Sequence, residues 1–355
     1  MKKLLALLLC AVLCLSLAAC ASNATTTETP AASTETAAEA PTETETAEAP
    51  AEESSAPSDD VAADQTFVVG ICQLVQHDAL DAATNGFMDA LEEALPGQVT
   101  FDLKNASNDI PTCGTIVTGF VASNVDLILA NATPALQAAS TATQTIPILG
   151  TAVTEYGVAL DIKDFSGTVG GNISGTSDLA PLDQQADMLL ELLPDAKNVG
   201  ILYCSAEANS VYQADVVKAA LEAKGVNVTV YTFADSNDVA TVTQTACAEN
   251  DALYIPTDNT AASCTEAINN VAEPAGVPIV AGEEGICKGC GIATLSIDYY
   301  ELGRTTGAMA AKILTGEANV SEMPIEYYQN PVKKYDAARC EALGITVPSD
   351  YVAIG

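Results

Sequence analysis

Hydrophobic positions from residue 65 onward form short β-branched runs that alternate with longer stretches of helical periodicity. A helix is predicted over 79–95, because Leu80, Phe87 and Leu91 recur at the spacing of one helical face. Parallel strands need crossover connections, so this alternation indicates βαβ units and a parallel sheet. The strands predicted in this first series lie at 67–71, 99–104, 125–130 and 146–149.

A second series with the same rhythm follows Gly175, which favours two similar lobes over one large sheet. Its predicted helices lie at 181–193, 206–224, 238–249 and 260–273, and its predicted strands at 199–203, 226–233, 252–255 and 277–280. One more strand at 291–297 and a helix at 299–314, opened by Asp298 and Glu301 in capping-box order, follow the second series.

We therefore predict an α/β fold class with two doubly wound parallel-sheet lobes joined by a hinge that the chain crosses several times. The first lobe is expected to comprise 65–175 and about 297–322, and the second 176–296 and about 323–355. About 290 residues in this region exceed what one core usually holds, which supports two lobes. Open α/β sheets bind ligands outside the carboxyl ends of their strands, so the cleft between the lobes is the predicted site.

The first 20 residues have the pattern of an export signal. Lys2 and Lys3 precede an apolar stretch at 4–17, which is too short to span a membrane, and Ala18-Ala19 then supplies small residues for cleavage. Cys20 directly after them resembles the lipobox of bacterial lipoproteins. A signal peptide over 1–19 and lipidation of Cys20 are therefore expected; the alternative is an ordinary secretory signal in which Cys20 is incidental.

Residues 20–64 consist almost entirely of Ala, Thr, Glu, Ser and Pro and contain no aromatic residue. Such a composition cannot bury enough apolar surface to offset the entropy of ordering, so a disordered acidic tether is expected. The formal charge of −34 becomes −36 without Lys2 and Lys3, and the tether holds eleven acids, which leaves −25 on 65–355. This acidity argues against nucleic acid as a partner.

Eight cysteines are scattered through the predicted strands and helices, and most resemble small core residues rather than a disulfide framework. Cys287 and Cys290 form a C-x-x-C pair without a second pair or a histidine nearby. A local disulfide or a free pair is favoured over a redox or metal site. No metal and no cofactor is predicted.

Polar clusters follow the predicted strands of both lobes. Each can direct helix N-terminal N–H groups and hydroxyls into the cleft, an arrangement that suits a carboxylate. Thr133, Asn259 and Thr260 are equally explained as helix caps, and His77, the single histidine, as a loop residue. Glu207 and Asp258 on neighbouring loops of an acidic lobe favour a cation between them. The clusters are 73–81, 131–134, 151–154, 204–210 and 256–260.

Three of these clusters, together with a fourth segment at 297–304, resemble the ABC-transporter substrate-binding proteins with a type I periplasmic-binding-protein fold, and within them the group that binds tryptophan and related aromatic amino acids. The segments are Gln73 to Asp81 (QLVQHDALD), Glu207 to Ser210 (EANS), Pro256 to Thr260 (PTDNT) and Ile297 to Arg304 (IDYYELGR). The similarity covers about 67–354. Two departures stand out: Asp78 replaces a common proline, and the Cys287/Cys290 pair is not typical of the family.

The resemblance implies a cleft that closes on one amino-acid-like ligand, with an aromatic amino acid as the best candidate. The residues are assigned on physical grounds. N–H groups and hydroxyls at helix starts suit the ligand carboxylate, which is assigned to Thr133, Ser205 and Ser210. A buried ammonium needs acceptors, which Asp258, Glu207 or Asn209 could supply, and the ligand side chain is expected near Leu74, Val75 and Val153. The full predicted binding set is Gln73, Leu74, His77, Thr133, Thr151, Val153, Ser205, Glu207, Asn209, Ser210, Asp258 and Asn259.

The implied role is that of an extracytoplasmic monomer, anchored to the membrane through Cys20, which delivers a ligand to the permease and ATPase of an importer. An enzyme is disfavoured, because the single histidine lacks an evident nucleophile and no P-loop is present. Two alternatives stay open: a ligand-sensing ectodomain for a signalling partner, and a sugar- or nucleoside-binding protein of the same fold.

Overall fold

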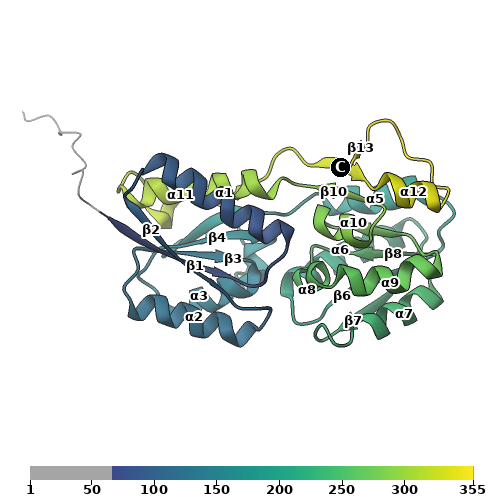
Figure 1. Cartoon of the computed structure of the whole chain (residues 1–355), viewed down its shortest axis with the longest axis horizontal. Helices are drawn as coiled ribbons and strands as arrows, with labels where there is room; N and C mark the ends of the chain where they lie inside the picture. The colour runs from purple at the N-terminus through teal and green to yellow at the C-terminus, as the bar shows by residue number, and fades with distance from the viewer. Residues whose placement is uncertain (1–65, 355) are drawn as a thin grey trace, which may run out of the picture. The chain divides into compact units, whose positions relative to one another are not determined.

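The computed structural model describes residues 66–354. The predicted signal peptide over 1–19, lipidation of Cys20 and the tether over 20–64 lie outside the described residues and stay predictions. The described chain forms two mainly parallel sheets with alternating helices (Figure 1), which confirms the predicted α/β fold class.

The first sheet has the order β11-β5-β4-β3-β1-β2, and all of its pairs are parallel. Its inner strands are buried on both faces, as β3 (Leu127–Asn131) illustrates with five buried residues in a row. The other strands are β1 (Phe67–Gln73), β2 (Val99–Asn105), β4 (Ile148–Val153), β5 (Ile173–Ser177) and β11 (Glu326–Tyr327).

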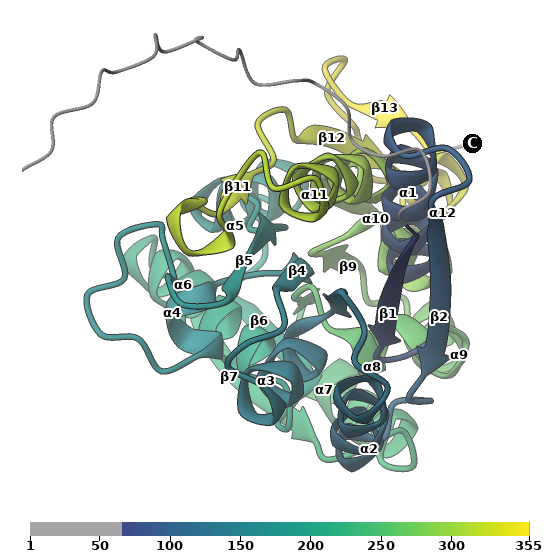
Figure 2. The ribbon, with the colours of Figure 1, turned by 90° about the vertical axis from the view of Figure 1, so that its left-hand side faces the viewer.

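Helices cover both faces of this sheet, and together they make up the first lobe. Figure 2 shows α1 (Asp78–Ala94) and α11 (Tyr299–Leu314) on one side and α2 (Ile110–Ala122) and α3 (Thr133–Ala142) on the other. The short α4 (Tyr156–Ala159) and the 3₁₀ turn η1 (Val320–Glu322) complete the lobe.

Helices α1 and α11 pack backbone to backbone through three glycines. A Cβ at Gly303 would lie 2.0 Å from the Ala83 carbonyl oxygen, and a Cβ at Gly86 would lie 2.1 Å from the Tyr300 carbonyl oxygen. A Cβ at Gly307 would lie 2.5 Å from the Phe87 carbonyl oxygen. The absence of side chains at these positions therefore fixes α11, a late segment of the chain, against the first helix of the lobe.

The second sheet has the order β13-β12-β10-β9-β8-β6-β7 and is parallel except for the antiparallel β10/β12 pair. Its strands are β6 (Asn198–Cys204), β7 (Asn227–Phe233), β8 (Ala252–Ile255), β9 (Ile279–Ala281), β10 (Ala293–Ser296), β12 (Val332–Tyr335) and β13 (Val352–Ala353). The helices of this second lobe are α5 (Leu182–Leu192), α6 (Ala208–Ala223), α7 (Val239–Glu249), α8 (Asn259–Ser263), α9 (Thr265–Ala275), α10 (Glu284–Cys290) and α12 (Ala337–Ala342).

The chain passes between the sheets three times: after β5, after β10 and after β11. The connecting residues are 178–181, 297–298 and 328–331. Strand β11 belongs to the first sheet, so the last passage lies after Tyr327 rather than near residue 323. The lobe boundaries given above otherwise stay predictions.

The structure differs from the predicted elements in two main places. The helix expected over 260–273 is divided into α8 and α9, because the backbone leaves helical geometry at Cys264. Strand β5 was not predicted, since Ile-Ser-Gly-Thr-Ser carries one large apolar residue, yet all five residues are buried between β4 and β11.

Candidate functional site

A small cavity of about 10 Å³ lies between the lobes, at the carboxyl ends of strands from both sheets. This volume holds about one water molecule, so a larger ligand has room here only when the lobes move apart. Its lining combines small apolar residues with polar and acidic ones: His77, Ala79, Leu80, Ala152, Thr154, Asp178, Asn209, Thr257, Asp258, Asn259, Ala262, Glu283 and Tyr299.

The first lobe contributes the start of α1 to the cavity. His77 is the N-cap residue of this 17-residue helix, and its side chain makes no capping hydrogen bond. The imidazole instead reaches the second lobe, where its Nε2 lies 3.2 Å from Asn259 Oδ1. Because the first N–H groups of a helix have no intrahelical partner, the start of α1 offers hydrogen-bond donors to the cavity.

The second lobe contributes the loops after β6 and β8, which Glu207 ties together. Glu207 Oε2 accepts hydrogen bonds from the backbone N (3.0 Å) and Nδ2 (2.7 Å) of Asn259. Glu207 Oε1 accepts from the backbone N and Oγ1 of Thr260, each at 2.8 Å. Asp258 joins the same loops, since its carboxylate accepts from Cys204 N at 2.8 Å and Ala261 N at 2.7 Å. Both carboxylates are therefore occupied by donors of their own lobe.

Three further lining residues are acidic or phenolic: Asp178, Glu283 and Tyr299. Asp178 directly follows β5, and its Oδ2 accepts a hydrogen bond of 3.0 Å from the hydroxyl of Tyr299, the first residue of α11. Glu283 is the N-cap of α10 and accepts from Gly285 N at 2.6 Å and from Ile286 N. None of these three residues was predicted from the sequence. The signal for Glu283 was its place just after a predicted strand, and that for Tyr299 was its place in the IDYYELGR segment.

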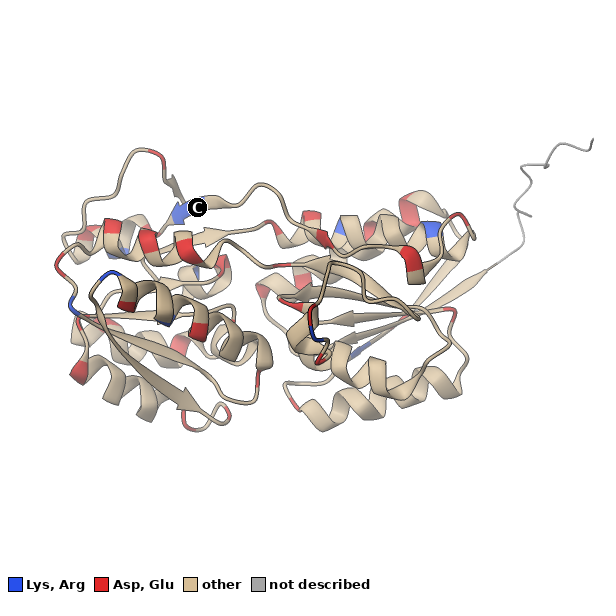
Figure 3. Ribbon diagram, turned by 180° about the vertical axis from the view of Figure 1, so that it is seen from behind, with Lys and Arg blue, Asp and Glu red and all other residues tan. Residues whose placement is uncertain are grey.

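The cavity is acidic. Burial raises the pKa of Asp178, Asp258 and Glu283, and it raises that of Asp258 from 3.8 to about 8 with help from the neighbouring Glu207 charge. The hydroxyls of Thr154 and Tyr299 favour the charged form of Asp178, and the charge of His77 favours that of Glu283. No Lys or Arg of residues 66–354 lines the cavity. Figure 3 shows the wider setting, with acidic residues outnumbering basic ones on both lobes. The cavity therefore favours a ligand with a cationic group.

We expect the ligand-free protein to unfold at a higher temperature at pH 5 than at pH 8. These three carboxyls keep their protons in the folded state at a pH where the unfolded chain has lost them, so stability falls as pH rises through their folded pKa values. Four other carboxyls have lowered pKa values: Glu93, Asp251, Glu284 and Asp350. They change the pH dependence of stability only below about pH 4.5, outside this range. Thermal unfolding between pH 5 and 8 measures the effect, and Asp258→Asn should flatten it. A midpoint that rises with pH would contradict the assignment.

Four of the predicted binding residues line the cavity: His77, Asn209, Asp258 and Asn259. Leu74 and Glu207 line a neighbouring depression, and Ser205 is exposed and bonds to the Phe233 carbonyl. Gln73 and Thr151 are buried, with hydrogen bonds inside the first lobe. The three remaining residues, Thr133, Val153 and Ser210, are buried outside this lining. A binding role for any of the twelve stays a prediction.

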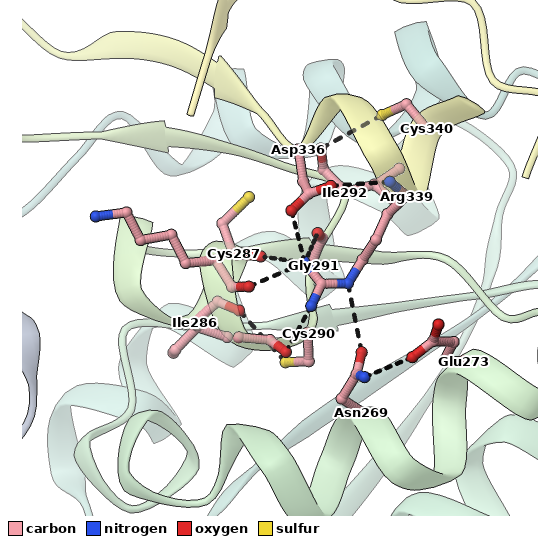
Figure 4. Close-up of polar contacts among 12 residues, drawn as sticks. Asn269, Glu273, Ile286, Cys287, Cys290, Gly291, Ile292, Asp336, Arg339 and Cys340 are labelled. Atoms are coloured by element: carbon pink, nitrogen blue, oxygen red, sulfur yellow. Dashed lines mark hydrogen bonds and ion pairs between the residues drawn. The ribbon is translucent and has the colours of Figure 1, made fainter. Parts of the chain in front are cut away.

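The C-x-x-C pair lies on α10, and both thiols are free and buried. Figure 4 shows their sulfur atoms pointing away from each other, beside Arg339. Arg339 donates to the carbonyls of Lys288 (2.9 Å) and Gly289 (2.7 Å) and pairs with Asp336 at 2.8 Å. It thereby holds the C-terminal end of the helix whose N-cap, Glu283, lines the cavity.

Within residues 66–354, no group of three or more His, Cys, Asp or Glu side chains is arranged to hold a metal ion. No helix in the same range is both long and apolar enough to cross a membrane.

Comparisons with known proteins identify a family in which a small ligand binds between two lobes. The family model described as ABC transporter substrate binding protein matches residues 68–353. The tyrosine-binding protein of Clostridioides difficile strain R20291 is 36% identical over 260 residues, which is 72% of this chain and 75% of the relative.

Two solved structures are similar to this chain in fold. The ABC domain from Streptococcus pneumonia in complex with L-Trp has a TM-score of 0.77 at 31% identity and covers 80% of this chain and 97% of its own. The ligand-free, open structure of CD0873, a substrate-binding protein with adhesive properties from Clostridium difficile, has a lower TM-score of 0.62 despite 36% identity, and covers 82% and 100%. This chain belongs to the family of ABC transporter substrate-binding proteins, extracytoplasmic components that present a small-molecule ligand to a membrane permease.

Proposed function

We propose that this protein captures an aromatic amino acid in the cavity between its lobes and delivers it to the permease of an ABC importer. The observation that carries the proposal is that three buried polar atoms without hydrogen-bond partners, on His77, Asp178 and Asn209, belong to residues lining this one cavity. Buried polar atoms without a partner are rare and unfavourable, so their concentration here indicates a place for a polar ligand.

The lining offers a complementary surface for each part of an amino acid. The acidic side chains suit the α-ammonium, and the N–H groups at the start of α1 suit the α-carboxylate. Leu80, the lining alanines and Tyr299, the one aromatic residue among them, suit an apolar or aromatic side chain. The L-Trp complex and the tyrosine-binding relative support an aromatic amino acid over other classes.

We further propose that the protein works as a monomer without catalytic activity, held at the extracytoplasmic face of the cell membrane by a lipid on Cys20. The lipobox pattern supports the anchor, and the acidic segment after it supports a tether that keeps the cavity near the permease. Sensing for a signalling partner uses the same fold and stays the second candidate. Sugar or nucleoside binding is disfavoured by the acidic lining without Arg.

A thermal-shift screen of amino acids, sugars and nucleosides tests the proposed ligand class. A ligand that binds only the folded state raises the unfolding midpoint in proportion to its affinity and concentration. We expect L-tyrosine or L-tryptophan to raise the midpoint by several degrees at concentrations about 100-fold above Kd. Stabilisation by a sugar or nucleoside and by no amino acid would overturn the proposal.

A further inference from the structure

Two of the buried cysteines, Cys72 and Cys113, come from adjacent elements of the first lobe. Cys72 lies in β1, and Cys113 is the fourth residue of α2. Both side chains are 0% exposed and belong to the same hydrophobic core cluster. Neither residue lines the cavity between the lobes, so ligand capture gives this pair no role.

The packing of α2 on β1 brings the two side chains together. The ring of Phe120 in α2 lies over Gly70 in β1, where a Cβ would be 2.7 Å from the ring. Cys72 is two residues after Gly70 and therefore points to the same face of the sheet. Cys113 is seven residues before Phe120, which is two helical turns and hence the same face of α2. A crossover helix runs opposite to its strands, so Cys113 lies over Cys72.

The two thiols contact each other. The Cys72 thiol donates a hydrogen bond to the Cys113 sulfur, which lowers the pKa of Cys113 and raises that of Cys72. Other thiols of residues 66–354 are placed differently. Those of Cys290 and Cys340 donate to backbone carbonyls, and the sulfur atoms of Cys287 and Cys290 point away from each other (Figure 4). Cys72 and Cys113 are thus placed to react with one another.

We propose that Cys72 and Cys113 are a modification site, which a disulfide joins in the exported protein. The free thiols of the structure are its reduced form. Proteins of this family work outside the cytoplasm, where disulfides form and persist. A disulfide needs two side chains that face each other across a short distance, and the packing of α2 on β1 supplies that arrangement.

The oxidant is a second disulfide, carried by a thiol oxidoreductase or by a small molecule. The Cys113 thiolate attacks one of its sulfur atoms, which forms a mixed disulfide and releases the first thiolate. Cys72 then loses its proton and attacks the Cys113 sulfur, which releases the second thiolate. The two cysteines lose two protons and two electrons, and the oxidant gains both and ends as two thiols. Because the folded protein buries both cysteines, the exchange takes place while the exported chain folds.

The bond fixes a part of the first lobe that faces the second lobe. It closes a loop over the 40 residues between the two cysteines, and such a crosslink restricts the unfolded chain. At the base of this loop the backbone N of Asn108 donates to the Leu74 carbonyl at 2.9 Å. The Asn108 side chain donates to Thr260 Oγ1 of the second lobe at 3.1 Å. The disulfide therefore holds a segment that contacts the second lobe.

Peptide mapping of the mature protein tests the bond directly. The protein is reduced and unfolded in urea, refolded with oxidised and reduced glutathione, and treated with iodoacetamide to block the remaining thiols. A protease that cleaves after Asp and Glu places Cys72 on residues 65–78 and Cys113 on residues 110–126, with no other cysteine on either peptide. We expect mass spectrometry to find these two peptides joined, and to find them separate after treatment with dithiothreitol.

Thermal unfolding of the oxidised and the reduced protein measures the effect of the bond. We expect the oxidised wild type to unfold about 5 °C or more above the reduced form. Cys72→Ala and Cys113→Ala should each abolish this difference, whatever the substitution itself costs, because each form is compared with its own reduced state. Cys287→Ala is the matched control, since it removes another buried thiol and should keep the difference.

Three results would overturn the proposal. The first is that iodoacetamide labels both Cys72 and Cys113 after refolding with oxidised glutathione. The second is that either cysteine is joined to a different one, and the third is that the oxidised and reduced wild type unfold at the same temperature. None of these results bears on the ligand, so the proposed function is tested separately by the thermal-shift screen.

Discussion

Alanine in place of Glu207 is expected to lower the free energy of unfolding by about 3 kcal/mol or more, since each buried donor left without an acceptor costs about 1–3 kcal/mol. Four donors lose their acceptor: the backbone N–H and side chains of Asn259 and Thr260. One effect opposes the loss, because removal of the Glu207 charge eases the ionisation of Asp258. Urea unfolding measures the difference.

Ligand binding should weaken with the same substitution, although Glu207 does not line the cavity. Without Glu207, Asn259 is free to turn, and the contact that orients His77 is lost. Asp258→Ala should also weaken binding, by one to several kcal/mol on the scale of a charge-assisted hydrogen bond. Glu207→Gln, which keeps one acceptor oxygen, should fall between the wild type and alanine. Wild-type affinity and stability in Glu207→Ala would contradict this role.

Gly303→Ala is expected to destabilise the first lobe by about 3 kcal/mol, at the upper end of the usual cost of overpacking. The added methyl group would lie 2.0 Å from the carbonyl oxygen of Ala83, and backbone atoms cannot rotate away as a side chain does. The two helices must therefore separate, which also displaces Tyr299 at the start of α11. Thermal or urea unfolding measures the loss.

Gly114→Ala provides a matched control, because it is expected to raise stability whereas Gly303→Ala lowers it. Gly114 lies within α2, and nothing is within 4 Å of its added methyl group. Alanine in a helix interior is favoured over glycine by about 0.5–1 kcal/mol, so this variant should be slightly more stable than the wild type. If both variants showed the same change, close packing of α1 on α11 would not be the cause.

The hydrophobic pattern predicted most of the fold because the inner strands of parallel sheets are buried on both faces and are rich in β-branched and aliphatic residues. Strand β5 lacks that composition and was missed. Gly175, at its centre, lies where a Cβ would be 2.1 Å from the Gly150 carbonyl oxygen. The neighbouring strand, rather than the propensity of its own residues, makes this segment a strand.

The candidate site was predicted in part for a related reason. The rule that ligands bind at strand ends identified His77, Asn209, Asp258 and Asn259, all of which line the cavity. Asp178 was missed because it follows the unrecognised β5. The sequence also could not show that Glu207 and Asp258 are occupied by backbone N–H groups whereas Asp178 keeps a free oxygen. Such occupancy depends on contacts between loops that are about 50 residues apart in the chain.

A crystal structure of the protein with L-tyrosine or L-tryptophan bound tests the central claim most directly. The account predicts the amino acid between the lobes, in contact with His77, Asp178 and Asn209 of the cavity lining. An amino acid bound elsewhere on the protein would contradict it.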